Sequence, residues 1–301
     1  MKVLLTGSNG LLGQKLVKLI LEKGDELIAT ARGKNRLPIP EDDYAYSTMD
    51  ITNREEVLRI IGKVKPDVVI HTAAMTNVDQ CETEKEDCWK LNVDAVEYII
   101  EACEQTSAYL IHLSTDFIFD GESGPYDEEG IPNPVSYYGD SKLAAEKLLF
   151  NSNIKYGVAR TVLVYGVAHD MSRSNIILWV KGSLEAGKDI KVVDDQLRSP
   201  TLAEDLAMGC YLMATKRAEG VYNISGRDLL TPYDMAIKTA DFFKLDTSTM
   251  TRADASSFTQ TAKRPPKTGF IIDKARKELG YDPRSFDEGI AILAEQMGYV
   301  R

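Results

Sequence analysis

The chain opens on an apolar run and a glycine-rich turn, Val3-Leu4-Leu5-Thr6-Gly7-Ser8-Asn9-Gly10-Leu11-Leu12-Gly13. In a strand–turn–helix unit the first glycine allows the tight turn, the second lets the backbone approach a pyrophosphate, and the third lets the helix pack on the strand. The helix N-terminus then offers free N–H groups and a positive dipole end to the phosphates. This placement predicts a dinucleotide-binding turn. Its predicted cofactor-binding residues are Gly7, Asn9, Gly10, Leu11, Leu12 and Gly13.

Apolar, β-branched runs alternate with amphipathic segments beyond this turn. The expected strands are residues 3–6, 26–31, 67–71, 108–113 and 156–161, and the expected helices are residues 11–22, 54–64, 84–105 and 136–150. Strands that are apolar throughout, in a strand–helix alternation, indicate a parallel sheet covered by helices on both faces. The predicted fold class is therefore α/β, a Rossmann-type doubly wound parallel sheet with a smaller C-terminal substrate-binding lobe.

The regular alternation of expected strands and helices becomes less clear after about Gly166. Helices are expected at residues 174–184 and 202–215, with a short strand at 189–193, and a polar stretch covers 252–266. We predict an NAD(P)-binding Rossmann domain over residues 1–166, to which residues 202–225 return. Residues 167–301 are predicted to be mainly a substrate-binding lobe laid over the carboxyl edge of the sheet.

Composition narrows the class of protein. The 301 residues are 44% apolar and 27% charged, as in soluble globular proteins, and the net charge of -10 argues against nucleic acid or an anionic membrane as a partner. A signal peptide and a membrane-spanning run are both missing from the sequence pattern, so we expect a cytoplasmic protein. Four cysteines and three histidines lack metal-ligand spacing, which predicts reduced thiols and no metal site.

The second expected strand ends at Arg32, followed by Lys34 and Arg36. An acidic residue here would accept from a ribose 2′-hydroxyl and favour NAD. A guanidinium instead suits a 2′-phosphate in geometry and charge. Arg32 therefore predicts NADPH as cofactor, with NADH use and an ordinary solvated basic loop as the alternatives.

Two further strand ends add cofactor candidates. Asp50 and Ile51 end the next strand and are placed to flank the adenine. Ala73, Ala74 and Met75 follow the fourth strand, where small residues let the backbone approach the cofactor.

Two adjacent tyrosines, Tyr137 and Tyr138, open the helix expected at 136–150. Residues four apart on a helix share a face, which pairs Tyr137 with Ser141 and Tyr138 with Lys142. An ammonium group one turn away stabilises a phenolate and moves the phenol pKa towards the range useful for proton transfer. Tyr138 is therefore the predicted acid or base, and Tyr137 a packing residue.

Thr115 completes the predicted catalytic group with Tyr138 and Lys142. It lies where the strand over 108–113 ends, at the edge where this architecture holds its ligands. Its hydroxyl is suited to donate a hydrogen bond to a substrate carbonyl. A lone Tyr-x-x-x-Lys occurs often by chance, but here it coincides with the glycine turn and the Ser-Thr-Asp strand end in the correct order.

These motifs resemble the extended short-chain dehydrogenase/reductase family and, within it, the dTDP-4-dehydrorhamnose reductases. The matching segments are residues 7–13, 72–79, 91–92, 114–121, 125–126, 138–146, 160–166 and 195–201. The resemblance implies that NADPH reduces the C4 ketone of a nucleotide-linked 4-keto-6-deoxysugar. It implies that Tyr138 protonates the alkoxide, that Thr115 polarises the carbonyl and that Lys142 also holds the nicotinamide ribose. Asn92 would steady the strand or helix that carries the water relay.

The same resemblance suggests substrate residues and a partner. The predicted substrate contacts are Thr76, Asp116, Phe117, Arg198 and Arg264. The resemblance implies a nucleotide sugar as the substrate. Many relatives dimerise through helices, so a homodimer is the assembly that the resemblance suggests.

The sequence also departs from that branch. Leu163 stands where the branch often has a tryptophan that packs on the sugar, and Arg198 stands where it often has glycine. Arg198 is interpreted either as a ligand of the substrate diphosphate or as a surface or salt-bridge residue, and Arg264 is a similar candidate.

Two other functions stay open at this point. One is a sugar-nucleotide epimerase or dehydratase on the same fold. Dehydratases of this type place two acidic residues after the threonine, whereas Asp116 is followed here by Phe117. The other is a non-catalytic regulatory subunit like the β subunit of methionine adenosyltransferase, against which the intact Thr115, Tyr138 and Lys142 weigh.

Overall fold

The computed structural model describes residues 1–170 and 174–299. Its centre is a seven-stranded parallel sheet in the order β10-β6-β5-β4-β1-β2-β3. The strands are β1 (Lys2–Thr6), β2 (Glu26–Ala31), β3 (Ala45–Thr48), β4 (Val68–His71), β5 (Tyr109–Thr115), β6 (Tyr156–Thr161) and β10 (Gly220–Asn223). The order reverses between β1 and β4, so their carboxyl ends open a crevice. The predicted doubly wound α/β fold is confirmed.

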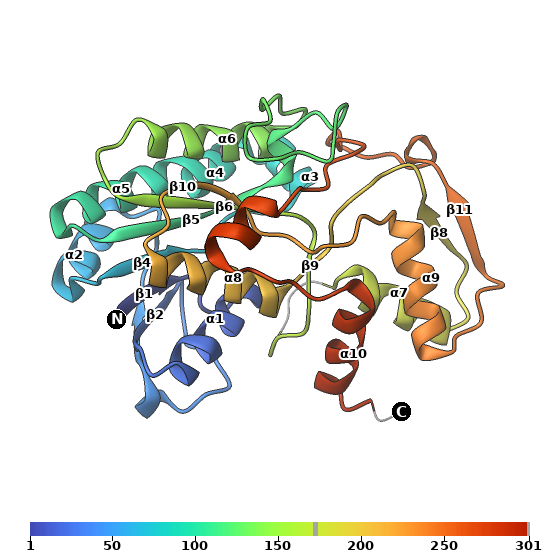
Figure 1. Ribbon diagram of the computed structural model, residues 1–301, viewed down its shortest axis with the longest axis horizontal. Helices are drawn as coiled ribbons and strands as arrows, with labels where there is room; N and C mark the ends of the chain where they lie inside the picture. Colours follow the sequence, from blue (N-terminus) through green and yellow to red (C-terminus); the bar gives the residue numbers. More distant parts are fainter. Residues whose placement is uncertain (171–173, 300–301) are drawn as a thin grey trace.

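Helices cover both faces of the sheet, as Figure 1 shows. On one face α2 (Arg54–Val64), α5 (Ala95–Thr106) and α6 (Tyr137–Phe150) pack their apolar residues against the strands. On the other face α1 (Leu11–Glu22) and α8 (Ala203–Lys216) do the same. Each layer buries apolar side chains of the same strands, because parallel strands between two helical layers are apolar on both sides.

One predicted helix, residues 84–105, differs in the structure. It begins as α4 (Lys85–Trp89), passes through a π-helical turn over Lys90–Asp94, and continues as α5. A separate short helix, α3 (Val78–Thr83), precedes it. The π turn carries Asn92, whose buried side chain hydrogen-bonds to the loop after β4. Apolar spacing predicts the path of the helix, but a wider turn leaves no mark in that spacing.

The smaller lobe, at the right of Figure 1, has its own packed core. It contains α7 (Ile176–Glu185), α9 (Pro232–Phe243) and α10 (Phe286–Gln296), together with a parallel pair of strands, β8 (Ile190–Val193) and β11 (Met250–Ala253). The strand β11 is not predicted from the sequence, and its last two residues overlap the stretch 252–266 that the sequence marks only as polar. Strand β8 pairs with it across a long sequence separation, which no local pattern shows.

The chain crosses between the two parts several times. Strand β7 (Val164–Tyr165) pairs with β9 (Thr201–Leu202) at the junction. Helix α8 and strand β10 then rejoin the sheet layers, β10 next to β6. Residues Ala275–Leu279 and Tyr281 pack in the same core as α8. The division at residue 166 stays a prediction.

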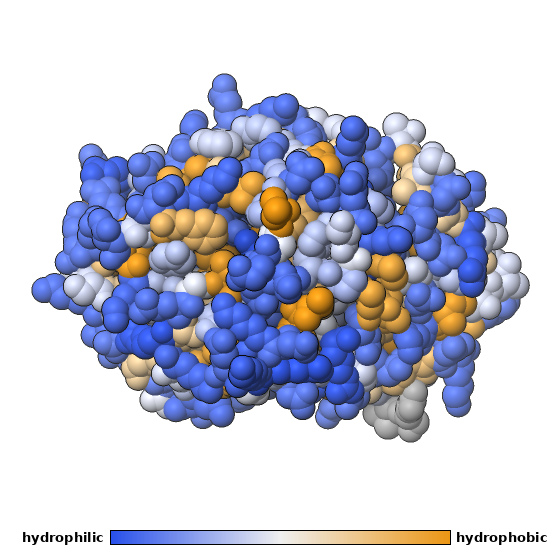
Figure 2. All heavy atoms as spheres, turned by 45° about the horizontal axis from the view of Figure 1, so that its top comes forward, coloured by the Kyte–Doolittle hydropathy of each residue, from blue (hydrophilic) through white to orange (hydrophobic). Residues whose placement is uncertain are grey.

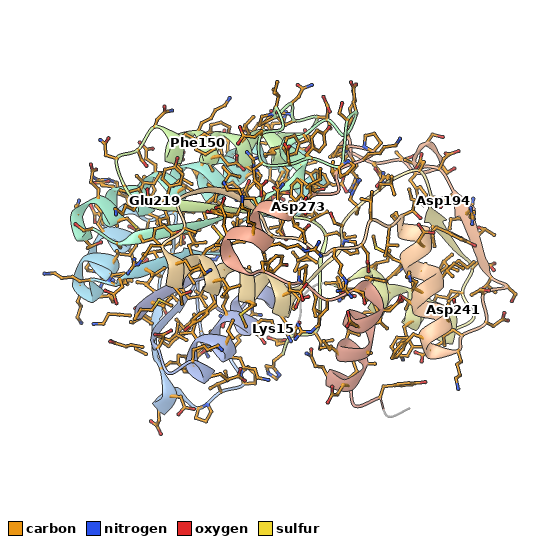
Figure 3. The ribbon with its side chains drawn as sticks, viewed as in Figure 1. Lys15, Phe150, Asp194, Glu219, Asp241 and Asp273 are labelled. Carbon is orange, nitrogen blue, oxygen red and sulfur yellow. The ribbon has the colours of Figure 1, made fainter. Side chains whose placement is uncertain are left out.

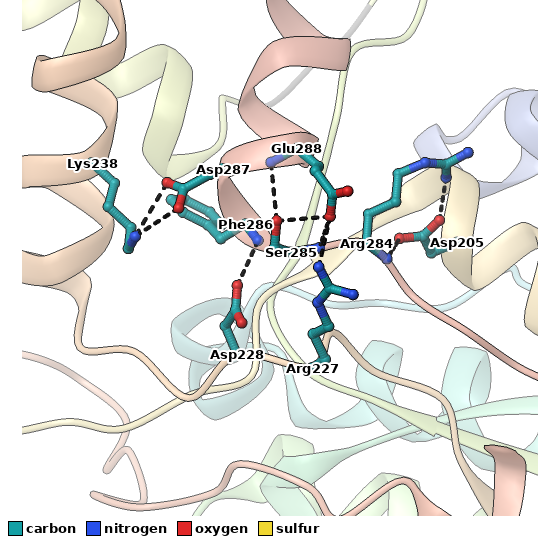
Figure 4. A network of polar contacts seen from close by, with 9 residues as sticks. All are labelled: Asp205, Arg227, Asp228, Lys238, Arg284, Ser285, Phe286, Asp287 and Glu288. Carbon is teal, nitrogen blue, oxygen red and sulfur yellow. Dashed lines mark hydrogen bonds and ion pairs between the residues drawn. The ribbon is translucent and has the colours of Figure 1, made fainter.

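A polar network fixes the start of α10, as Figure 4 shows. The Ser285 side chain caps this helix. The preceding Arg284 forms an ion pair with Asp205 of α8. Asp287 in the first turn pairs with Lys238 of α9 at 2.8 Å. The helix is thereby tied both to the sheet layers and to the smaller lobe.

The surface is mainly hydrophilic, with small separate apolar patches on the face seen in Figure 2. Glu219, Asp241 and Asp273, which are labelled in Figure 3, are among the exposed charged side chains. Within the described ranges, no helix combines the length and the apolar character needed to cross a membrane.

Candidate active site

A cavity of about 860 Å³ lies at the carboxyl edge of the sheet, between the sheet layers and the smaller lobe. One wall comes from the glycine turn, the loop after β4, the end of β5 and the start of α6. The other wall comes from the smaller lobe and its connections. The sequence-predicted residues on these walls are Asn9, Gly10, Leu11, Leu12, Ala74, Met75, Thr76, Thr115, Asp116, Phe117, Tyr138, Lys142, Arg198 and Arg264.

The glycine turn has the shape that a pyrophosphate requires. Gly7 has a φ of +70°, and a Cβ atom there would lie 2.8 Å from the backbone nitrogen of Ala73. A Cβ atom at Gly13 would lie 2.2 Å from the carbonyl oxygen of Gly7. Gly10 is exposed, lines the cavity and caps α1 without any side chain. The first N–H groups of α1 are thus available to phosphate oxygens, and the turn fits a dinucleotide.

Asn9 fixes the basic loop beside this turn. Its amide nitrogen donates to the Lys34 carbonyl at 3.0 Å, and its amide oxygen accepts from the Arg36 backbone N–H at 3.0 Å. Arg36 lines the cavity and forms a 3.2 Å ion pair with Asp170. Arg32 is exposed at the end of β2. The structure therefore holds the backbone of the basic loop against the glycine turn, and Arg36 is the basic side chain of this loop that lines the cavity. The predicted place of Arg32 beside a 2′-phosphate stays a prediction.

Asp50 and Ile51 are outside the group of described residues that line the cavity. The Asp50 carboxylate accepts from the backbone and the hydroxyl of Thr52, at 3.0 and 2.8 Å. Ile51 is buried in the apolar core beneath α2. Their predicted place beside an adenine stays a prediction.

Asn92 supports the site from behind the wall. It is buried, and its amide oxygen accepts from the Met75 backbone N–H at 2.9 Å. Its amide nitrogen donates to the Met75 carbonyl and to the Ser141 hydroxyl, both at 3.0 Å. Asn92 thus joins the loop after β4 to the helix that carries Tyr138.

Tyr138 and Lys142 lie on one face of α6 and both line the cavity, as their spacing predicts. Ser136 caps this helix by accepting from the Gly139 N–H at 3.3 Å. Tyr137 packs instead against Trp89, with ring centroids 6.1 Å apart. With Ala145 and Leu149 of α6 packed against the sheet, the face of the helix that carries Tyr138 and Lys142 lines the cavity, and Tyr137 packs outside it.

The protonation of these groups departs from the expectation. Burial raises the pKa of the Tyr138 phenol, and this effect exceeds the lowering by its hydrogen bond with Thr115. The net shift of the Tyr138 pKa is therefore upward, opposite to the expected net lowering. Burial lowers the pKa of Lys142 to about 8, against the opposing charge of Glu146. Its Nζ lies 3.2 Å from Nε2 of His112. Tyr138 is therefore held in the protonated, donating form.

Asp116 and Phe117 mainly support their neighbours. Asp116 is buried and accepts from the hydroxyl of Thr115 at 3.0 Å and from that of Thr268. Burial raises its pKa, and the charge of Arg198 opposes this. Phe117 packs edge-on against the Tyr138 ring, with centroids 5.7 Å apart.

Arg198 is only 5% exposed, so the surface alternative is wrong. One terminal nitrogen donates to the carbonyls of Leu197 and Pro266, at 2.8 and 2.9 Å. The other donates to the Gln196 side chain and to the Pro265 carbonyl, at 3.1 and 2.6 Å. Both terminal nitrogens therefore cross-link two loops of the smaller lobe. A contact to a diphosphate stays a prediction.

Arg264 lines the cavity and forms an ion pair within the protein. It forms a 2.6 Å ion pair with Asp79 of α3, and both side chains are partly exposed. This pair ties the loop before Pro265 to the sheet side of the cavity.

Sequence reasoning missed several lining residues. The missed residues include Ser114, Thr161, His169, Asp170, Asn175, Gln196 and Pro232. Most lie in irregular connections, where no local periodicity indicates which side chains reach the cavity. Leu163 lines the cavity with a φ of +39° and 43% exposure. It also lines an adjoining apolar hollow of about 520 Å³ that contains the partly exposed Trp179.

The sheet order, the glycine turn and the Thr115–Tyr138–Lys142 arrangement are those of an extended short-chain dehydrogenase/reductase. Comparison with protein families is more specific. Residues 1–298 match the family described as RmlD substrate binding domain, and the chain belongs to this family.

Curated relatives carry two different functions. The chain is 31% identical over 306 residues to a dTDP-4-dehydrorhamnose reductase of Aggregatibacter actinomycetemcomitans, covering 96% of this chain and 97% of the relative. It is also 31% identical over 252 residues to the methionine adenosyltransferase 2 subunit beta of Xenopus tropicalis, covering 82% and 73%.

Solved structures agree with the fold. A dTDP-4-dehydrorhamnose reductase from Clostridium acetobutylicum superposes with a TM-score of 0.88 at 28% identity, over 99% of this chain and 100% of the other. One from Bacillus anthracis, in complex with NADP, has a TM-score of 0.84 at 26% identity, over 98% and 100%.

Proposed function

We propose that this protein uses NADPH to reduce the C4 ketone of a nucleotide-linked 4-keto-6-deoxysugar. The observation that carries the proposal is that Thr115, Tyr138 and Lys142 share one cavity with the glycine turn. Family membership supports the substrate class, and the NADP complex of the Bacillus anthracis reductase supports the cofactor.

The chain offers matching contacts to each part of the cofactor. The pyrophosphate would bind at Gly10, Leu11 and the N-terminus of α1. The 2′-phosphate would be held by Arg32, in the loop that Asn9 fixes. Lys142 would hold the nicotinamide ribose. Bound NADPH supplies the hydride.

The remaining chemistry belongs to the protein. Thr115, whose hydroxyl donates to Asp116 in this structure, would turn its one hydrogen to the ketone oxygen when substrate binds. It would thereby stabilise the negative charge that develops there. Tyr138 then gives its phenolic proton to the alkoxide, because burial keeps the phenol protonated before the reaction. Positive charge on Lys142 stabilises the phenolate that remains.

A spectrophotometric assay tests this proposal. Purified protein is mixed with NADPH and a panel of nucleotide-linked sugars, and NADPH oxidation is followed by absorbance. Oxidation with 4-keto-6-deoxysugars, and none with the corresponding 4-hydroxy sugars, is expected. Formation of a 4-keto product from dTDP-glucose without reductant would instead assign the protein to the dehydratases.

The similarity to a methionine adenosyltransferase subunit favours one second candidate, a regulatory subunit. That function needs no proton donor, whereas this chain places Tyr138 beside Thr115 in the cavity wall. The test is co-purification with a methionine adenosyltransferase catalytic subunit, with its kinetics measured with and without this protein. A stable complex from a protein that oxidises no NADPH would replace the reductase proposal.

A further inference from the structure

Behind Lys142 lies a buried pair of histidines that the proposed reaction does not use. His112 of β5 and His71 of β4 stack with ring centroids 5.6 Å apart. Nε2 of His112 lies 3.2 Å from Lys142 Nζ, and Nδ1 of His71 lies 2.8 Å from the Thr6 hydroxyl. Both residues are almost fully buried. Only His112 of the two therefore touches a predicted catalytic group.

The tautomer of His112 follows from this contact. Burial keeps the His112 pKa well below its ordinary value, with the charge of Lys142 adding to the effect, so the ring is neutral. Nε2 then accepts from the ammonium and Nδ1 carries the proton. Nδ1 is buried and has no hydrogen-bond partner among the described residues. A buried donor without an acceptor costs free energy of folding.

The free-energy cost of the unpaired Nδ1 donor helps to distinguish two roles for His112, filling space in the sheet or acting on Lys142. If the residue only filled space in the sheet, an apolar side chain of similar size would serve better, because it would leave no unpaired donor. The arrangement is favourable only where the imidazole acts on Lys142, whose ammonium needs a hydrogen-bond acceptor once it is buried.

We propose that His112 is a positioning residue, a neutral acceptor that holds Lys142 protonated and aimed at the cavity. This inference rests on the proposed function. His112 touches neither substrate nor cofactor, and acts only through Lys142.

Other groups also set the charge of Lys142, and none replaces the acceptor. Glu146, on the same helix, opposes its deprotonation, but both Glu146 oxygens are bound to Arg160, at 3.0 and 2.7 Å. Cys88 of α4 acts in the same direction. Its Sγ hydrogen-bonds to the Ser141 hydroxyl at 3.5 Å. His71 hydrogen-bonds to Thr6, and burial followed by the charge of Lys142 lowers its pKa to about 3, so its ring is neutral.

The test compares His112→Leu, His112→Gln and the matched control His71→Leu in the full-length protein. His112→Leu removes the acceptor, and the pKa that limits activity at high pH should fall by about one unit, a tenfold change in the protonation constant. His112→Gln keeps an acceptor oxygen and should recover most of that shift. His71→Leu should leave the alkaline limit unchanged.

The melting temperature distinguishes a positioning role of His112 from a purely structural role. At pH values below the Lys142 pKa of about 8, His112→Leu should melt lower than wild type, because the buried ammonium has lost its acceptor. Above that pH it should melt at or above the wild-type temperature, because the variant also removes an unpaired donor. His71→Leu should melt lower, because it removes the bond to Thr6. A lower melting temperature for His112→Leu at every pH, together with an unshifted alkaline limit, would overturn the inference.

A binding measurement separates this inference from the proposed reaction. NADPH affinity is followed by fluorescence between pH 7 and 9. As the pH rises, the affinity of His112→Leu should begin to weaken at a lower pH than that of wild type or His71→Leu. If wild-type protein oxidises no NADPH with any substrate, the proposed reductase function is refuted. The shift in the pH dependence of NADPH binding would still support the positioning role of His112. Active wild type with identical binding profiles in all variants refutes the role of His112 alone.

Discussion

The two walls of the cavity are built differently. On the sheet side, Tyr138 and Lys142 face the cavity while buried groups behind them, His112 among these, fix their position. On the lobe side, Arg198 and Arg264 also reach the cavity, but their terminal nitrogens bond to the protein itself. Reactive groups and bracing groups can thus look alike in a sequence, and only the partners of each side chain distinguish them.

The largest expected effect lies on the sheet side. Tyr138→Phe removes the proton donor and should lower kcat by about a hundredfold to ten-thousandfold, the usual contribution of a positioned general acid. Circular dichroism and NADPH binding should stay close to wild type. Tyr137→Phe is the control and should keep most activity. A reversed result for the two variants would mean that α6 presents its other face to the substrate.

The next effect lies on the lobe side and concerns stability. Arg198→Met keeps the length of the side chain but leaves buried carbonyls of Pro265 and Pro266 without donors. The free energy of unfolding, measured by chemical denaturation, should fall by about 2–4 kcal/mol. Unchanged stability with a large rise in KM would contradict the bracing role and make Arg198 a substrate ligand.

The pH dependence sharpens the description of the sheet side. The pKa of Lys142 is about 8, below the ordinary 10.5, so kcat/KM should fall about tenfold per pH unit above 8 as the ammonium is lost. Between these two values the unfolded chain binds more protons at this site than the folded one, so this group makes the free energy of unfolding rise with pH. Activity and this stability contribution should therefore move in opposite directions. A parallel loss of both above pH 8 would point to unfolding instead.

A smaller effect is expected in the loop beside the glycine turn. Arg32→Ala should weaken NADPH binding roughly tenfold and leave NADH binding unchanged, because only NADPH has a phosphate to lose. Arg36→Ala should weaken NADPH binding less, since Arg36 already forms an ion pair with Asp170. Titration of both cofactors measures this, and an equal loss for NADH and NADPH would show that Arg32 is an ordinary solvated residue.

The smallest effect is expected for the partly exposed pair on the lobe side. Arg264→Ala breaks the ion pair with Asp79, whose side chain is 40% exposed. Such pairs contribute under about 1 kcal/mol, so the loss of stability should be small beside that of Arg198→Met. A loss as large as that of Arg198→Met would mean that both arginines brace the lobe equally.

The sheet and the sheet-side wall could be predicted because their determinants are local. The strand–turn–helix order predicts the glycine turn, and the spacing of Tyr138 and Lys142 predicts a shared helical face. The lobe side could not be predicted. The burial of Arg198 depends on Pro265 and Pro266, far along the chain. The pairing of β8 with β11 also joins distant segments. The pKa of Tyr138 depends on burial, which the spacing to Lys142 does not reveal.

The π turn over Lys90–Asp94 has a consequence for how such a site can be gained or lost. A π turn accommodates one residue more than a regular α-helix of the same path. Deleting one residue there would restore a regular helix on the same path, and the flanking segments would keep their faces. Within the turn itself the backbone would change, and with it the position from which Asn92 reaches Met75 and Ser141, while α5 kept its packing on the sheet. The anchor behind Tyr138 thus depends on chain length at one point, and a deletion would change it while leaving the flanking helices packed.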